Sequence, residues 1–171
     1  MGLPVKQFLA ATNVNDTVPS FLESGVYQPK PSVQTYSNAM DVGNPSNWVR
    51  IMDMFNEDAS ELKQRITGYS FTDEDTVQAI QQVYDAHEYI VCPHTAIAWL
   101  ALKDYQYNNP EDNSTGVFLS TAHPCKFPEV FPEKIAEKIV VPEQVKELEA
   151  RSKLIVSIGN DFEAFKGYLL K

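Results

Sequence analysis

Two short motifs carry the residues that could do metal chemistry in this sequence. Cys92-Pro93-His94 and His123-Pro124-Cys125 are mirror images of one another. Two thiolates and two imidazoles form a ligand set that binds zinc tetrahedrally, but structural zinc motifs usually leave about two to four residues between paired ligands. Here a single proline intervenes. A small zinc-binding protein using these four residues is therefore an alternative, and the other interpretation is two helix entries with proline near the first turn.

A Cys-His nucleophilic pair is a second alternative for the same motifs. It requires a thiol of lowered pKa with a base beside it. Nothing in the sequence alone marks Cys92 or Cys125 as exposed or activated. The third histidine, His87, falls at helical spacing from Ile80 and Tyr84, and we expect it to flank an apolar helix face.

A hydroxyl-bearing segment is better placed for ligand binding. Ser120 to Pro124 directly follows a short apolar run at 116–120, which predicts a buried strand. In open α/β sheets, ligands bind beyond the carboxyl ends of strands. A hydroxyl there can hydrogen-bond to a heterocycle nitrogen, but Ser and Thr also cap helices. The residues alone leave both roles open.

Two other polar runs occupy comparable positions. Asn13 to Thr17 follows the first predicted strand, and Ser37 to Asn47 is dense in small polar side chains. Such a run forms either a capping loop or a cavity lining, and the sequence alone does not choose between them.

The elements that must position these residues alternate between short strands and helices, which predicts a helix-rich α/β fold with a small, mainly parallel sheet. Loops are expected at 27–32 and 105–115, where polar residues and proline gather. Strands are predicted at 5–12, 89–91 and 116–120. Helices are predicted from Asn15 or Asp16 to Gly25, from Asn44-Pro45 onward, and at 58–66. Further helices are predicted after a near-capping box at Thr72–Asp75 and at 93–102, 143–151 and 161–170.

The overall composition excludes several classes of partner. The chain has 171 residues and a formal net charge of −9, which argues against binding to nucleic acid or to an anionic membrane. No apolar run approaches the roughly 18 to 20 residues that span a bilayer. Two cysteines are too few to form a disulfide framework, so we expect the protein to reside in a reducing cytoplasm. The 7 glycines are few for a protein with a phosphate-cradling loop.

Several sequence blocks together resemble threonine synthases, in the branch of the family found in bacteria and fungi. They occur in family order and with family-like spacing, from the first residue almost to the last. Each block is weak alone, and the set is specific. The blocks are 1–5 (MGLPV), 8–19 (FLAATNVNDTVP), 32–35 (SVQT), 37–48 (SNAMDVGNPSNW), 93–96 (PHTA) and 120–127 (STAHPCKF).

The resemblance implies that residues 1–171 are one unit, the C-terminal part of the catalytic domain of a fold-type II pyridoxal phosphate enzyme. The family is a carbon–oxygen lyase acting on phosphate, which converts O-phospho-L-homoserine and water to L-threonine and phosphate. The family's Schiff-base lysine motif and its Gly/Asn-rich phosphate loop have no match in this chain. No catalytic residue is therefore assigned, and we expect an inactive fragment that self-associates through a face left apolar by missing chain.

The resemblance also assigns candidate site residues. In related cofactor enzymes a Ser or Thr hydroxyl faces the pyridine nitrogen, and Thr121 matches that position. Asn38, Asp41, His123 and Lys126 are candidates for substrate contact or cavity lining, Lys126 because its charge suits a substrate phosphate.

Two cysteines depart from the family pattern. Cys92 stands where many relatives have Asp, which loses a good helix N-cap, and Cys125 stands where many have Ala. Both are interpreted as structural drift. A non-catalytic interaction module that retains the fold is the remaining alternative.

Overall fold

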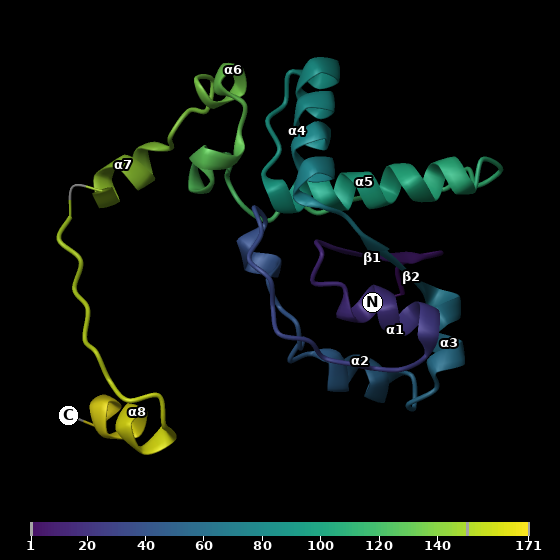
Figure 1. Cartoon of the computed structure of the whole chain (residues 1–171), viewed down its shortest axis with the longest axis horizontal. Helices are drawn as coiled ribbons and strands as arrows, with labels where there is room; N and C mark the ends of the chain where they lie inside the picture. The colour runs from purple at the N-terminus through teal and green to yellow at the C-terminus, as the bar shows by residue number, and fades with distance from the viewer. Residues whose placement is uncertain (1, 150, 171) are drawn as a thin grey trace. The chain divides into compact units, whose positions relative to one another are not determined.

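The computed structural model describes residues 2–149 and 151–170, and the chain forms two compact units, one up to Ile139 and one from Val140 onward. The first contains the sheet and most of the helices (Figure 1). The described part of the second contains the helices α7 (Glu143–Glu149) and α8 (Phe162–Leu169). The helix α8 is capped by the Asp161 carboxylate, which accepts from the Ala164 N–H at 2.9 Å. The assignment of residues 1–171 to one part of a catalytic domain stays a prediction.

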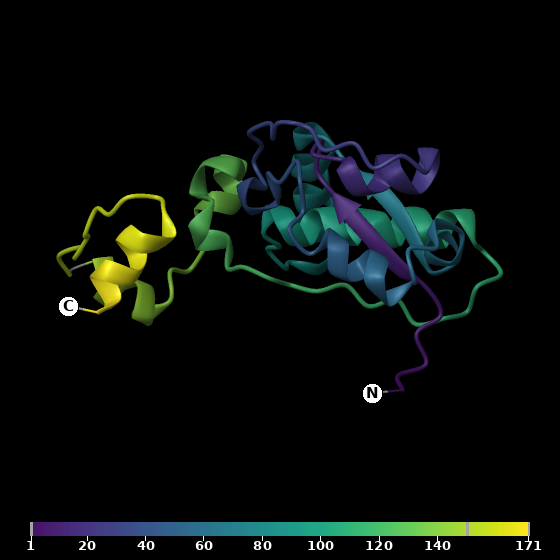
Figure 2. The ribbon, with the colours of Figure 1, turned by 90° about the horizontal axis from the view of Figure 1, so that it is seen from below.

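A two-stranded parallel sheet lies at the centre of the first unit. β1 (Phe8–Thr12) pairs with β2 (Ile66–Ser70), with Phe8 opposite Ile66 and Thr12 opposite Ser70. Parallel strands need a long crossover, and three helices supply it (Figures 1 and 2). They are α1 (Thr17–Ser24), α2 (Trp48–Met54) and α3 (Ala59–Arg65).

The first helix packs closely on the second strand because of one glycine. A Cβ on Gly68 would lie 2.7 Å from Cα of Pro19, so only glycine permits this approach. The helix α1 follows Asp16 and ends at Gly25, which adopts φ 77°. Both ends agree with the prediction, since a left-handed residue after a helix favours glycine.

A small aromatic cluster fills the space between α1, α2 and α3. Phe21, Trp48 and Leu62 are buried, and Tyr27 stacks on Trp48 at 4.9 Å between ring centroids. The helix α2 begins at Trp48, later than predicted. The Pro45 carbonyl accepts from the Trp48 N–H at 3.1 Å, in a turn that precedes the helix.

The larger core lies between two longer helices, α4 (Asp73–His87) and α5 (Pro93–Asn108). The predicted capping box is confirmed, because Thr72 and Asp75 exchange hydrogen bonds between side chain and backbone at 2.9 and 3.1 Å. His87 is exposed at the end of α4. The core of the unit consists of Ala79, Ile80, Val83, Val91, Cys92, Ala96, Phe127, Val130, Phe131 and Ile135, the last from the short helix α6 (Glu133–Ala136).

Two predicted strands are wrong and one strand was missed. Residues 116–120 are extended but make no backbone–backbone hydrogen bond within the described ranges, and Val117 and Leu119 are 78% and 73% exposed. Residues 89–91 run into α5 without a partner strand. β2 follows α3 without a loop, so the sequence offers no boundary there. In the part of the chain that the structure describes, no helix has the length and apolar character required to cross a bilayer.

The core makes a direct stability prediction. Ile80 is fully buried on α4, so Ile80→Ala should lower the free energy of unfolding by about 2–5 kcal/mol through lost burial and a cavity. Urea denaturation at pH 7 measures this. Gln82→Ala, at an exposed position of the same helix, is the control and should change stability little. A loss below about 1 kcal/mol for Ile80→Ala would contradict this core assignment.

Candidate functional site

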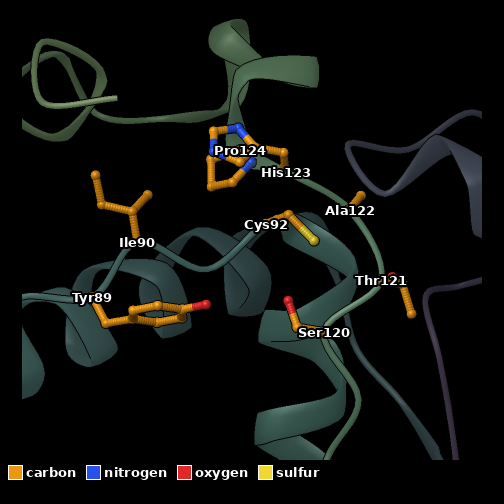
Figure 3. Close-up of a pocket in the computed structure, with 8 residues that line it drawn as sticks. All are labelled: Tyr89, Ile90, Cys92, Ser120, Thr121, Ala122, His123 and Pro124. Atoms are coloured by element: carbon orange, nitrogen blue, oxygen red, sulfur yellow. The ribbon is translucent and has the colours of Figure 1, made fainter. Parts of the chain in front are cut away.

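The hydroxyl-bearing segment identified in the sequence forms one wall of a small cavity. This cavity has a volume of about 320 Å³ and is lined by Tyr89, Ile90, Cys92 and residues 120–124 (Figure 3). The segment lies against the first turn of α5, where Thr95 Oγ1 is 3.4 Å from Ser120 Oγ. Thr95 is fully buried, so this contact anchors the start of the segment to a rigid helix end.

A second, larger cavity of about 930 Å³ shares Thr121 with the first. Its walls come from the chain before and within β1, from one face of α5, and from the extended residues after α5. Its lining is mostly apolar, and includes Leu3, Val5, Phe8, Leu9, Met40, His94, Ala98, Leu102, Val117, Phe118, Leu119 and Thr121.

Thr121 is the one described residue that lines both of these cavities. It is exposed, and in Figure 3 its side chain points away from Tyr89 and Cys92. Thr121 therefore lies where the two cavities meet. Its predicted role as a ligand group stays a prediction, but its position is compatible with that role.

The other candidate residues are not all brought together. His123 lines the smaller cavity, and its Nδ1 accepts from the Cys125 N–H at 3.2 Å, closing a short 3-10 turn at Pro124–Lys126. Lys126 lines neither cavity, and its Nζ is 5.7 Å from the centroid of the Phe127 ring. Asn38 is exposed and also lines neither cavity.

Asp41 belongs to a scaffold of hydrogen bonds. Its carboxylate accepts from Thr35 Oγ1 at 2.7 Å, from the Thr35 N–H at 3.0 Å and from Asn13 Nδ2 at 2.9 Å. It lines neither of the two cavities. These bonds tie the loop at 33–41 to the end of β1, which is how Met40 reaches the larger cavity wall.

Asn13 is central to this scaffold, and the sequence identified it only as the first residue of the polar run 13–17, with capping loop and cavity lining both left open. It is 1% exposed, and its Oδ1 accepts from the Asn15 N–H at 2.9 Å. Asn15 in turn bonds to both backbone groups of Val33, at 2.7 and 2.9 Å. The available signal was the Asn-x-Asn spacing directly after a strand, since such side chains replace backbone partners in turns.

The zinc alternative is not supported. Within the described residues, no three His, Cys, Asp or Glu side chains gather in an arrangement that could hold a metal ion. Cys92 is buried, Cys125 is half-buried, and neither forms a disulfide among the described residues.

An ionic cluster borders the larger cavity at the end of α5. Lys6 Nζ is 2.8 Å from Asp112 Oδ2, and the same oxygen accepts from the Tyr105 hydroxyl at 2.9 Å. The Ser114 N–H donates to Asp112 Oδ1 at 2.9 Å. The Lys6 ammonium and these donors hold the pKa of Asp112 well below its usual range. Asp112 thereby fastens the loop after α5 to the chain before β1.

Comparison with known proteins shows which family this chain resembles. The family model "Threonine synthase, C-terminal" matches residues 95–169. Threonine synthase of Haemophilus influenzae is 40% identical over 174 residues, covering 100% of this chain and 39% of that protein. The Escherichia coli threonine synthase is 40% identical over 170 residues, covering 99% of this chain and 38% of that protein. Along almost its whole length, the chain is similar to the C-terminal part of threonine synthases.

Solved structures agree on the part of the threonine synthase fold that is present. The crystal structure of Escherichia coli threonine synthase matches with a TM-score of 0.79 at 38% identity, covering 99% of this chain and 38% of that chain. The structure of PLP-bound threonine synthase from Brucella melitensis matches with a TM-score of 0.75 at 25% identity, covering 99% and 41%. This chain corresponds to the C-terminal part of threonine synthases, and the predicted fold class is confirmed.

The Asp112 cluster predicts an acid dependence of stability. The pKa of Asp112 in the folded chain lies below its value in the unfolded chain, which is about 4. Above that unfolded pKa, the ionised carboxylate contributes fully to the stability of the fold. This contribution is lost as the pH falls toward the folded pKa. Asp112→Asn should therefore lower stability at pH 7 and flatten the decline in acid. Urea denaturation across the acid range measures both.

The matched control for this test is Glu111→Gln, which removes the exposed carboxylate next in the chain. It should leave both the stability at pH 7 and its acid slope close to those of the parent chain. An Asp112→Asn variant with the parent's acid slope would contradict the assignment of that slope to the cluster.

Proposed function

We propose that this chain supplies the C-terminal part of a threonine synthase that converts O-phospho-L-homoserine and water to L-threonine and phosphate with pyridoxal phosphate. The similarity to threonine synthases and the PLP-bound relative from Brucella melitensis support this. The chain spans 38–39% of the length of the relatives from Haemophilus influenzae and Escherichia coli. We propose that the Schiff-base lysine and the phosphate loop lie in the part of the protein that these residues do not represent.

The observation that carries the proposal is the position of Thr121. Thr121 is an exposed residue that lines both cavities, on a segment held against the buried first turn of α5. The larger cavity has mainly apolar walls and a volume of about 930 Å³, which suits an aromatic ring with a few polar substituents. His94 lines the same cavity, and neither of its ring nitrogens has a hydrogen-bond partner among the described residues. These residues fit one end of such a ring.

The role proposed for Thr121 follows from the chemistry of a hydroxyl. When bound, pyridoxal phosphate supplies the electron sink that stabilises negative charge on a substrate carbon. The Thr121 hydroxyl would hydrogen-bond to the pyridine nitrogen and fix the tilt of the ring. A neutral hydroxyl stabilises a protonated nitrogen less than a carboxylate does, so this contact favours a moderate electron sink.

Three further residues are proposed as weaker contributors, of which only His123 lines one of the two cavities. His123 lines the smaller cavity beside Thr121, within reach of groups that extend past it. Lys126 follows in the same segment and offers a cation to a substrate phosphate, and Asn38 precedes Met40, which lines the larger cavity.

We propose the cytoplasm as the location, since the thiols of Cys92 and Cys125 are free among the described residues.

A chimera tests the role of Thr121. This chain would replace the matching C-terminal part of the Haemophilus influenzae enzyme, to which it is 40% identical. Loss of one hydrogen bond to the cofactor costs about 1–3 kcal/mol, so Thr121→Val should lower kcat by about 5- to 150-fold. Thr121→Ser keeps the hydroxyl and should restore most of the rate. Cofactor absorbance and steady-state kinetics are the readouts.

The control for this test is Thr115→Val. Thr115 is also exposed and also lines the larger cavity, but it is not assigned a cofactor contact, so its replacement should leave kcat within about twofold. If Thr121→Val retains the parent's kcat and cofactor spectrum, the hydroxyl does not serve the pyridine nitrogen. If the Thr121→Val chimera forms threonine at the parent's rate, this result refutes only the role proposed for Thr121. The proposal that the complete protein carries out the family's reaction would still stand.

We also propose that the chain in isolation self-associates through the apolar wall of the larger cavity. Val117 and Leu119 are 78% and 73% exposed there, and the backbone of 116–120 makes no backbone–backbone hydrogen bond among the described residues. An exposed, extended apolar segment with unpaired backbone groups favours pairing with another strand. In the isolated chain, the molecule proposed to cover this apolar wall is a second copy of the same chain.

Sedimentation velocity over a range of protein concentrations measures this association. The parent chain should shift from monomer to dimer, and a Val117→Ser/Leu119→Ser double variant should stay monomeric at the same concentrations. Tyr107→Ser is the matched control, because Tyr107 is 84% exposed but does not line the cavity. A parent chain that stays monomeric at the highest concentration would refute the self-association.

A further inference from the structure

One buried histidine has no hydrogen-bond partner. His94 lies in the first turn of α5 and is 6% exposed. In the part of the chain that the structure describes, its Nδ1 and Nε2 are the only buried side-chain nitrogen or oxygen atoms without a partner. The nearby Cys92 thiol is paired with Thr95 Oγ1 at 3.1 Å instead. Buried polar atoms are almost always paired, so this exception requires an explanation.

The surroundings of the imidazole indicate a missing ligand. His94 lines the larger cavity of about 930 Å³, so a molecule bound there can contact its ring. The ring packs against Phe127, with 5.1 Å between the ring centroids, which limits its rotation. A neutral imidazole carries one N–H donor and one acceptor nitrogen. The cavity wall therefore contains a fixed donor that no described residue uses.

His94 lies at the same end of the larger cavity as Thr121. The residue that follows it, Thr95, has its Oγ1 3.4 Å from Ser120 Oγ. Thr121 in turn follows Ser120, and neighbouring Cα atoms are about 3.8 Å apart. His94 and Thr121 therefore flank one contact between α5 and the segment at 120–124, and both line the larger cavity. A ligand that meets Thr121 also approaches the imidazole.

The charges on the cavity wall favour an anionic oxygen as the partner of His94. Lys6 also lines the cavity, but its Nζ is 2.8 Å from the Asp112 carboxylate, so its charge is already paired. His94 stands at the N-terminal end of a helix of 16 residues, where the helix dipole stabilises negative charge. A hydrogen bond to a charged oxygen is also about twice as strong as one to a neutral oxygen.

We propose that the His94 imidazole donates a hydrogen bond to an anionic oxygen of the molecule bound in the larger cavity. This inference rests on the proposed function, which supplies two sources of such an oxygen. One source is pyridoxal phosphate, and the other is the carboxylate or phosphate of O-phospho-L-homoserine. The hydrogen bond that His94 lacks in the chain alone then forms when the ligand binds, and His94 is a binding residue in addition to Thr121.

The chimera with the Haemophilus influenzae enzyme distinguishes the two sources. His94→Leu is similar in volume and removes both ring nitrogens. If the oxygen belongs to the cofactor, this variant should bind pyridoxal phosphate about 10- to 150-fold more weakly, measured by absorbance titration. If the oxygen belongs to the substrate, the cofactor affinity should equal the parent's, and KM for O-phospho-L-homoserine should rise by the same factor, with a smaller change in kcat.

Two conservative variants test whether the donor itself is responsible. His94→Asn and His94→Gln each place an amide N–H near one of the two ring nitrogens. One of them should recover most of the affinity that His94→Leu loses. If neither recovers it, the effect comes from packing, and the proposed hydrogen bond is refuted.

The 171-residue chain supplies a readout that does not depend on the cofactor. An unpaired buried imidazole costs free energy in the chain alone, so His94→Leu should leave the midpoint of urea denaturation unchanged or raise it. A midpoint lowered as far as by Ile80→Ala would show that the imidazole is already paired within the chain. That result would overturn the proposal.

The matched control is Gln106→Leu, which also replaces a polar side chain on the wall of the larger cavity. Gln106 lies about three turns further along α5, roughly 18 Å from His94 at 1.5 Å per residue. Its replacement should leave the cofactor affinity and KM within about twofold.

The outcomes separate this inference from the proposed function. A His94→Leu chimera with the parent's cofactor affinity and KM would refute the role of His94 and leave the proposed function intact. A parent chimera that binds no pyridoxal phosphate would contradict the proposed function, and the role of His94 with it.

Discussion

The contact between the start of α5 and the segment at 120–124 is the constraint on which the candidate site depends. Thr95 Oγ1 lies 3.1 Å from Cys92 Sγ and 3.4 Å from Ser120 Oγ, so one buried hydroxyl connects the helix entry to the segment. Pro93 fixes the direction of that entry without losing a hydrogen bond. An extended segment with no backbone pairing of its own thereby acquires a defined position. Thr121 is the next residue, and it lies at the junction of the two cavities as a consequence.

The opposite wall of the larger cavity depends on a second kind of constraint, a buried polar scaffold. The parallel pair β1–β2 sets the position of Asn13 at the end of β1, and Asn13 with Asp41 holds the loop at 33–41. Such groups are costly to bury unless every one is paired. The loop is therefore well defined although it has little regular structure. The solved threonine synthases of Escherichia coli and Brucella melitensis match the backbone over 99% of this chain.

Local signals predicted the helices well and the strands poorly. The capping box at Thr72–Asp75, Gly25 and Pro93 each act through neighbours in sequence, so α1, α4 and α5 begin or end where expected. Strand formation at 116–120 requires a distant partner, and none occurs among the described residues. β2 was missed because its pairing with β1 is non-local. Thr121 was identified through family resemblance, and its place between the two cavities depends on the contact of Ser120 with Thr95, which lies 25 residues away in the sequence.

The central claim is that Thr121 presents its hydroxyl to a cofactor ring held between this wall and a wall outside these residues. A crystal structure of a threonine synthase that contains this chain, with pyridoxal phosphate bound, measures it most directly. The account predicts Thr121 Oγ1 within about 2.6–3.2 Å of the pyridine nitrogen, with the apolar wall around Val117 covered by protein. Thr121 covered by packed side chains, or the ring nitrogen paired with another residue, would contradict it.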